Sequence, residues 1–148
     1  AKRALASHSK FYFFDIGVFR ANRPTGPLDA PQETDGAALK GLVAQHLRAW
    51  CDYSGGNHQL YYWQTRSQSE VDFVVYGESG LYAIEVKNSG RINSEDLRAL
   101  KSFAEDYPDS RRYLLYRGRE RLLRDGVLCL PCSDFLIGLA PDRQWPTR

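Results

Sequence analysis

Hydrophobic and polar positions alternate most regularly in the stretch EVDFVVYGESGLYAIEVK, residues 70–87. Its β-branched and aromatic residues recur with a period of two, which is typical of β-strands. Val71, Phe73 and Val75 fall on one face of the first strand by this pattern. Residues 77–80 interrupt it with glycines and a serine, which favour a tight turn. The pattern predicts two antiparallel strands, the second beginning at Leu81.

The remaining chain shows helical and strand patterns in turn. An apolar stripe at i, i+3, i+4 and i+7 runs through residues 39–50, and it predicts a helix from an N-cap at Thr34 or Asp35 to about Asp52. His46 lies within that stripe, so we interpret it as a core or boundary histidine rather than a ligand. The other predicted elements are an extended aromatic segment at 10–18 with a turn at 15–17, a loop at 22–33, a strand at 58–66, a helix capped by Ser94 and ending near Asp106, a strand at 111–117, a turn or short helix at 119–124, a strand at 127–130 and a last helix at 132–139.

The order of these elements predicts the architecture. A helix, a three-strand antiparallel meander, a second helix and another strand form an αβββαβ core, which indicates an α/β fold with a mixed sheet flanked by helices. The strand at 111–117 follows a helical crossover, so we expect it to be parallel to its neighbour. The 148 residues suit a single domain. We expect an N-terminal extension and loop at 1–33 and the core at 34–148.

Composition places the chain among ordinary globular proteins. Its formal net charge is only +2, so overall charge does not argue for nucleic acid. No apolar run has the length of a membrane span and no signal peptide is visible, so we expect no membrane contact. The sequence contains no Met. We therefore expect it to be a piece of a longer protein.

Two other features have weaker chemical interpretations. Cys129 and Cys132 form a C-x-x-C motif, which suits a redox pair or half of a zinc site. A second pair is missing and the histidines are scattered, so we favour free, buried or half-buried thiols. Arginines cluster in residues 111–124 with acidic residues nearby. A solvated surface is favoured there over a phosphate-binding face.

The candidate chemistry lies on the central strand pair. Asp72 is followed, after twelve intervening residues, by Glu85 and then Lys87. The two carboxylates could hold one or two Mg²⁺ ions, which prefer oxygen ligands. The amine could then position water or stabilise charge on a phosphate. In the alternative interpretation, Lys87 forms an ordinary ion pair with Glu85 or Asp72 at a solvated strand end.

This pattern resembles the PD-(D/E)xK superfamily of restriction-endonuclease-like nucleases. Within it, the chain is similar to a nuclease-like domain of unknown function at the C-terminus of bacterial and archaeal AAA-type P-loop ATPases. The resemblance covers about nine-tenths of the chain. Its matching segments are residues 10–17, 36–47, 62–66, 70–73, 83–87, 97–103 and 113–114.

The resemblance implies a restriction-endonuclease-like fold in a cytoplasmic ATPase. ATP would be bound only by the N-terminal ATPase domain of that parent protein, because no Walker motif occurs in this chain. Related domains carry a Glu in the first helix as a further metal ligand, and Lys40 stands at that position here. A cation there would repel metal.

Two main functions follow from these observations and remain open at the level of sequence, beside a third, weaker alternative, a structural dimerisation domain. The first is Mg²⁺-dependent hydrolysis of DNA or RNA by Asp72, Glu85 and Lys87, with weaker nucleic-acid contacts from Gln64, Arg66 and Arg91. The second is a catalytically inactive nuclease-fold module that binds nucleic acid, a protein partner or its own ATPase motor. The sequence indicates neither the substrate nor the oligomeric state.

Overall fold

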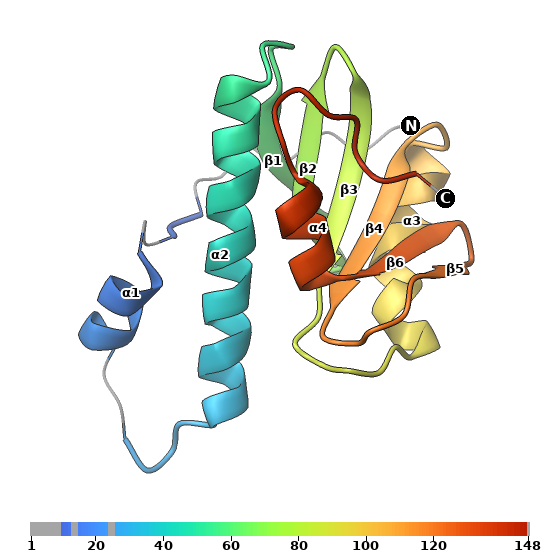
Figure 1. The fold of residues 1–148 in the computed structure, drawn as a ribbon. Coiled ribbons are helices and arrows are strands. Elements are labelled where there is room, and N and C mark those ends of the chain that lie inside the picture. The colour runs from blue at the N-terminus through green and yellow to red at the C-terminus, as the bar shows by residue number, and fades with distance from the viewer. Residues whose placement is uncertain (1–9, 13–14, 24–25, 148) are drawn as a thin grey trace.

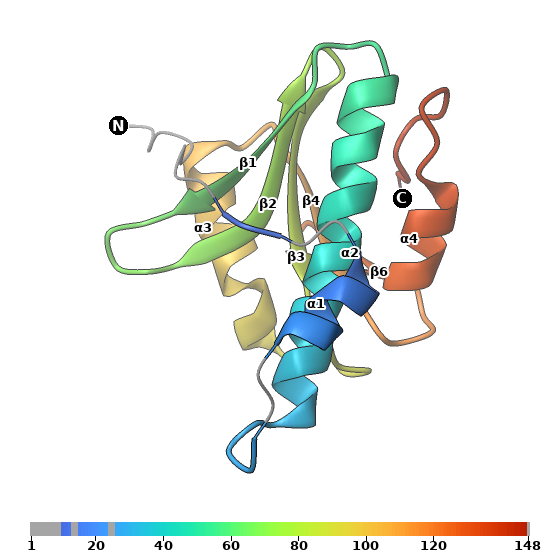
Figure 2. The ribbon, with the colours of Figure 1, turned by 90° about the vertical axis from the view of Figure 1, so that its left-hand side faces the viewer.

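The computed structural model describes residues 10–12, 15–23 and 26–147 and shows a mixed sheet between two layers of helices (Figures 1 and 2). Its elements are α1 (Ile16–Asn22), α2 (Pro31–Tyr53), β1 (Gln59–Gln64), β2 (Glu70–Gly77), β3 (Gly80–Val86), the 3₁₀ helix η1 (Ser94–Leu97), α3 (Arg98–Asp106), β4 (Arg111–Tyr116), β5 (Leu122–Arg124), β6 (Val127–Pro131) and α4 (Cys132–Gly138). Within these residues, no helix is long and apolar enough to cross a membrane.

The six strands are arranged in the order β1-β2-β3-β4-β6-β5. The antiparallel β1-β2-β3 meander is confirmed, and β4 lies parallel to β3, as the crossover predicts. Strand β6 is parallel to β4 and pairs on its other side with β5 in an antiparallel manner. The predicted α/β fold with a mixed, helix-flanked sheet is therefore correct.

Each face of the sheet has its own hydrophobic cluster. Helices α2 and α4 cover one face, and α3 covers the other (Figure 2). On the first face, Leu47 and Trp50 of α2 pack in one cluster with Phe73 of the sheet. On the second, Leu100 and Phe103 of α3 pack with sheet residues that include Trp63 and Leu114. The predicted helical stripe at 39–50 is thus the inner face of α2.

The structure corrects the predicted face of Val71. Phe73 and Val75 belong to the cluster under α2, but Val71 belongs to the cluster under α3 together with Val74. A change of register in the β1–β2 ladder between Tyr61 and Trp63 disturbs the alternation here. A strict period of two therefore fails at the start of β2, next to Asp72.

Two predicted boundaries were wrong for reasons of helix capping and initiation. Residues 16–22 form α1 instead of an extended segment and turn, because the Asp15 carboxylate accepts a hydrogen bond from the Val18 N–H at 2.9 Å. Phe13 and Phe14 of that predicted segment lie outside the described residues. Helix α2 begins at Pro31, inside the predicted loop, because proline suits the first helical position.

The C-terminal third shows a further difference. Residues 122–124 form β5, whereas the sequence predicted a turn or short helix at 119–124. Pairing with β6 stabilises this short strand, and such pairing is not visible in the local pattern. The final helix was predicted correctly as α4. Cys129 and Cys132 are buried free thiols and Cys51 is partly buried, as expected.

Candidate functional site

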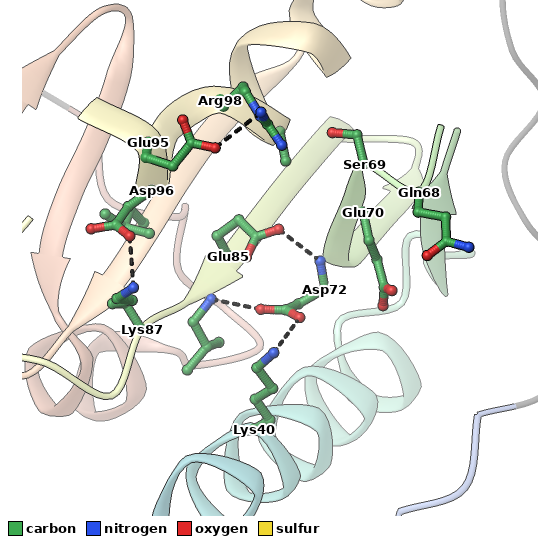
Figure 3. A pocket seen from close by; sticks show the side chains of 13 residues that line it. Lys40, Gln68, Ser69, Glu70, Asp72, Glu85, Lys87, Glu95, Asp96 and Arg98 are labelled. Carbon is green, nitrogen blue, oxygen red and sulfur yellow. Dashed lines mark hydrogen bonds and ion pairs between the residues drawn. The ribbon is translucent and has the colours of Figure 1, made fainter. Parts of the chain in front are cut away.

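A cavity of about 430 Å³ lies where β2 begins and β3 ends, between α2 and the η1–α3 segment (Figure 3). It brings together residues from distant parts of the chain. The lining residues are Lys40, Gln68, Ser69, Glu70, Asp72, Glu85, Val86, Lys87, Glu95, Asp96, Arg98, Ala99 and Leu114. The three residues predicted as catalytic, Asp72, Glu85 and Lys87, are among them.

Asp72 occupies the centre of this cavity and is 7% exposed. Regular pairing of β2 with β3 ends at the Phe73–Ile84 pair. Beyond that pair, the Asp72 carboxylate accepts the Val86 N–H through Oδ2 at 3.0 Å, and the Asp72 N–H donates to Glu85 Oε1 at 3.2 Å. Side chains thus replace backbone partners at this end of the ladder, which aims both carboxylates into the cavity.

Lys40 of α2 reaches the same carboxylate. Its Nζ lies 2.8 Å from Asp72 Oδ1 (Figure 3), whereas the Val86 N–H donates to the other oxygen, Oδ2. Burial lowers the pKa of Lys40, but attraction and hydrogen bonding to Asp72, with smaller contributions from Glu85 and Tyr12, more than offset this effect. The net result is a raised pKa, so Lys40 is a firmly protonated cation at neutral pH.

Glu85 has an environment that opposes ionisation. Burial raises the pKa of this carboxyl well above its usual value, and the neighbouring Asp72 carboxylate raises it further. The ammonium of Lys40 acts in the opposite direction without cancelling the effect. Of the two predicted metal ligands, Asp72 is paired with a cation, and the raised pKa of Glu85 favours its protonated, neutral form.

Lys87 lines the cavity but binds a different partner. Its Nζ lies 2.7 Å from Asp96 Oδ1. Asp96 also accepts the Asn93 N–H at 2.7 Å, and the two residues form the capping box of η1. The predicted N-cap, Ser94, is one residue late. The alternative ion pair of Lys87 with Asp72 or Glu85 is not the one the structure shows.

The other acidic residues of the cavity also form ion pairs with basic side chains. Arg98 Nη1 lies 3.0 Å from Glu95 Oε1 on an exposed turn, and Lys10 forms an ion pair with Glu70 at the rim. Among residues 10–12, 15–23 and 26–147, no cluster of three or more His, Cys, Asp or Glu side chains has a geometry that could hold a metal ion. Protein cations, rather than an open acidic pocket, face these carboxylates.

Comparison with known proteins identifies the family. Residues 35–135, which carry most of the cavity, match the family described as Domain of unknown function (DUF4143). The chain belongs to this family. It is 28% identical over 102 residues to the uncharacterized proteins Mb2031c of Mycobacterium bovis and Rv2008c of Mycobacterium tuberculosis. These matches cover 68% of the chain but only 22% of each relative. No solved structure matches it.

The family match begins and ends inside the described fold. It includes most of α2, the meander, α3 and the C-terminal strands, and it ends within α4 at residue 135. Lys40, Asp72, Glu85 and Lys87 all lie within the matched segment. Lys10 and α1 lie before it, and the segment that follows α4 lies after it.

The weaker nucleic-acid candidates do not gather at the cavity. Gln64, Arg66 and Arg91 are exposed, and none lines it. The turn between β1 and β2 instead contributes Gln68 and Ser69, which the sequence analysis missed. It also missed Asp96, although the Asn-x-x-Asp pattern before a helical segment is a recognisable capping signal.

Proposed function

We propose that this domain is a catalytically inactive nuclease-fold module that serves as an interaction domain of a longer protein. The observation that carries the proposal is the ion pair between Lys40 and Asp72, 2.8 Å long, at the position where a nuclease of the resembled superfamily would bind metal. The ammonium supplies the positive charge that a divalent cation would otherwise provide.

The donor set does not suit Mg²⁺ as it stands. This ion requires several hard, ionised oxygens in near-octahedral geometry. Both oxygens of Asp72 are already engaged, one by Lys40 and one by the Val86 N–H. Burial and the adjacent Asp72 charge raise the pKa of Glu85, which weakens it as a ligand at neutral pH. A metal ion would have to displace Lys40 and draw a proton from Glu85.

The charge pattern favours a protein partner over nucleic acid. Lys40, Lys87 and Arg98 are each paired with a carboxylate of the same cavity, so the described lining residues carry no excess of positive charge to attract phosphates. In the N-terminal part, Phe11 and Leu28 are exposed apolar side chains, with exposed fractions of 81% and 98%. Exposed apolar residues of this kind suit contact with another protein surface.

The length of the relatives supports the modular interpretation. The chain spans 22% of the two mycobacterial proteins that it matches. The resemblance to C-terminal domains of AAA-type ATPases makes an ATPase motor of the same parent protein our preferred partner. ATP binding would belong to that motor and not to this domain.

A metal-dependent nuclease remains the second candidate because Asp72, Glu85 and Lys87 do share one cavity. Calorimetric titration of Mg²⁺ and Mn²⁺ separates the two functions. We expect no saturable binding by the wild-type domain and no metal-dependent cleavage of single-stranded DNA, duplex DNA or RNA. Metal binding that disappears in Asp72→Ala, together with cleavage, would establish the nuclease instead.

A matched pair of variants tests whether the Lys40 ammonium is what prevents metal binding. Lys40→Glu replaces the ammonium by a third carboxylate, whereas Arg48→Glu makes the same charge change on an exposed position of α2. We expect Lys40→Glu, but not Arg48→Glu, to acquire Mn²⁺ binding, because only the first adds a ligand beside Asp72. Equal behaviour of the two variants would show that Lys40 does not block the site.

A further inference from the structure

A second cavity, of about 280 Å³, lies at the opposite end of the β2–β3 hairpin from Asp72. The end of α2, the hairpin turn and residues 141–145 enclose it. In Figure 1, the red segment after α4 passes over this end of the sheet. Among the described residues, the two cavities share no lining residue, so we treat this one as a separate site.

Aromatic rings from three parts of the chain form one wall. The ring centroids of Trp145 lie 4.3 Å from Tyr82 and 5.1 Å from Trp50. All three rings are buried, with exposed fractions between 3% and 5%. They supply rigid apolar surface against which a flat ligand can pack.

Hydrogen-bond donors and cations form the rest of the boundary. Arg111 and Arg143 line the cavity, and within the described part of the chain neither guanidinium forms an ion pair. Trp145 is 97% buried, and its indole N–H has no hydrogen-bond partner among the described residues. Asp142 is the opposing charge on the lining. The excess of cations over carboxylates on the lining favours an anionic ligand.

A fixed histidine completes the site. His58 Nε2 lies 2.6 Å from Ser79 Oγ and accepts the Ser79 N–H at 3.4 Å. His58 Nδ1 lies 3.0 Å from Ser54 Oγ. These serine contacts, one at each ring nitrogen, fix the orientation of the imidazole. The Tyr82 hydroxyl lies 3.0 Å from both the carbonyl oxygen and the Oγ of Ser79, so this serine is held against the aromatic wall.

Two glycines make room for this ring. A Cβ at Gly56 would lie 2.3 Å from His58 Cε1, and one at Gly77 would lie 2.4 Å from Cδ2. Any larger residue at either position would displace the imidazole. The chain thus positions His58 and Ser79 on the lining of an aromatic, cationic cavity.

We propose that this cavity binds a small aromatic anion, a planar ring system of one or two rings that bears a carboxylate or phosphate group. The ring would pack against the wall formed by Trp50, Tyr82 and Trp145, and the anionic group would bind Arg111 and Arg143. A volume near 280 Å³ equals that of roughly nine liquid waters, which suits a ligand of this size.

Nuclear magnetic resonance of the indole N–H groups tests the proposal directly. The probes are indole-3-acetate and adenosine 5′-monophosphate, each with a neutral counterpart, indole-3-acetamide and adenosine. We expect at least one anion to shift the Trp145 indole resonance saturably. Trp63, which packs under α3, provides an internal reference that should not move. Resonances are assigned with single Trp→Phe variants.

Three arginine variants separate site binding from general charge attraction. Arg111→Gln and Arg143→Gln should each weaken binding at least fivefold, whereas Arg119→Gln, at an exposed position outside the cavity, should leave it unchanged. The tighter of the two anions distinguishes a carboxylate from a phosphate ligand. No saturation by either anion below about 10 mM, equal binding of the neutral counterparts, or equal effects of all three variants would overturn the proposal.

Discussion

At the scale of single residues, the chemistry of the candidate site depends on which charged side chains form ion pairs. Asp72 is nearly buried and binds Lys40, and Lys87 is drawn away to Asp96. A buried carboxylate must have a partner, because an unpaired charge in such a place is costly. The ion pairs that form in the folded chain therefore decide whether these residues can bind a metal ion or only match the sequence pattern of a metal site.

The raised pKa of Glu85 predicts a specific pH dependence. The folded state retains the Glu85 proton from the unfolded pKa, about 4.3, up to the higher folded pKa, so stability falls as pH rises through this window. Glu85→Gln cannot ionise. Its free energy of unfolding should therefore increase relative to wild type between pH 4 and the folded pKa, by at most about 1.4 kcal/mol per pH unit.

Urea denaturation at a series of pH values measures this difference. Glu105→Gln, at an exposed position of α3, is the control and should follow the wild-type profile. Parallel profiles for wild type and Glu85→Gln would contradict the raised pKa.

At the scale of elements, caps decide where helices begin. Asp15 caps α1, and Asn93 and Asp96 cap η1 reciprocally. The second cap has a further role, since the Asp96 carboxylate also holds Lys87 at the cavity wall. One side chain therefore connects the start of the crossover helix with the end of β3.

Neighbouring substitutions in η1 test this role. Asp96→Ala should lower the free energy of unfolding by about 1–2 kcal/mol, because it removes a cap and leaves Lys87 without its partner. Glu95→Ala removes only the exposed pair with Arg98 and should cost less than about 1 kcal/mol. Urea unfolding monitored by circular dichroism compares them. Equal losses of unfolding free energy in the two variants would mean that the capping box adds no stability beyond that of an exposed ion pair.

At the scale of the whole molecule, the segment after α4 completes the core although it lies beyond the family match. Trp145 is 3% exposed and packs among Trp50, Tyr82 and Phe135, which belong to α2, the sheet and α4. The Trp50 indole N–H donates to the Ala140 carbonyl at 3.1 Å. The C-terminal segment thus joins the sheet with both helices that cover this face.

Removing the Trp145 side chain should lower the stability of the entire domain. We expect Trp145→Ala to cost about 3–5 kcal/mol, because it empties a large buried site. Ile137→Ala, at a position of α4 that is 83% exposed, should change stability by less than about 0.5 kcal/mol. Thermal and urea unfolding measure both variants. A small effect of Trp145→Ala would show that the C-terminal segment is not part of the core.

The sequence by itself determined the order of the main elements, the antiparallel meander and the convergence of Asp72, Glu85 and Lys87 on one cavity. These features follow from hydrophobic periodicity and from the opposite facing of neighbouring strand positions, which are local properties of the chain. The inner face of α2 was predictable for the same reason, since its apolar stripe has the helical period.

Only the tertiary structure decided the partners. Lys40 meets Asp72 because α2 lies across the start of β2, and Lys87 meets Asp96 because the capping box fixes that carboxylate near the end of β3. Strand β5 exists because β6 pairs with it, and Val71 changes face where the ladder shifts register. Ion pairing and strand pairing depend on which groups packing brings within reach, and a one-dimensional pattern does not contain those distances.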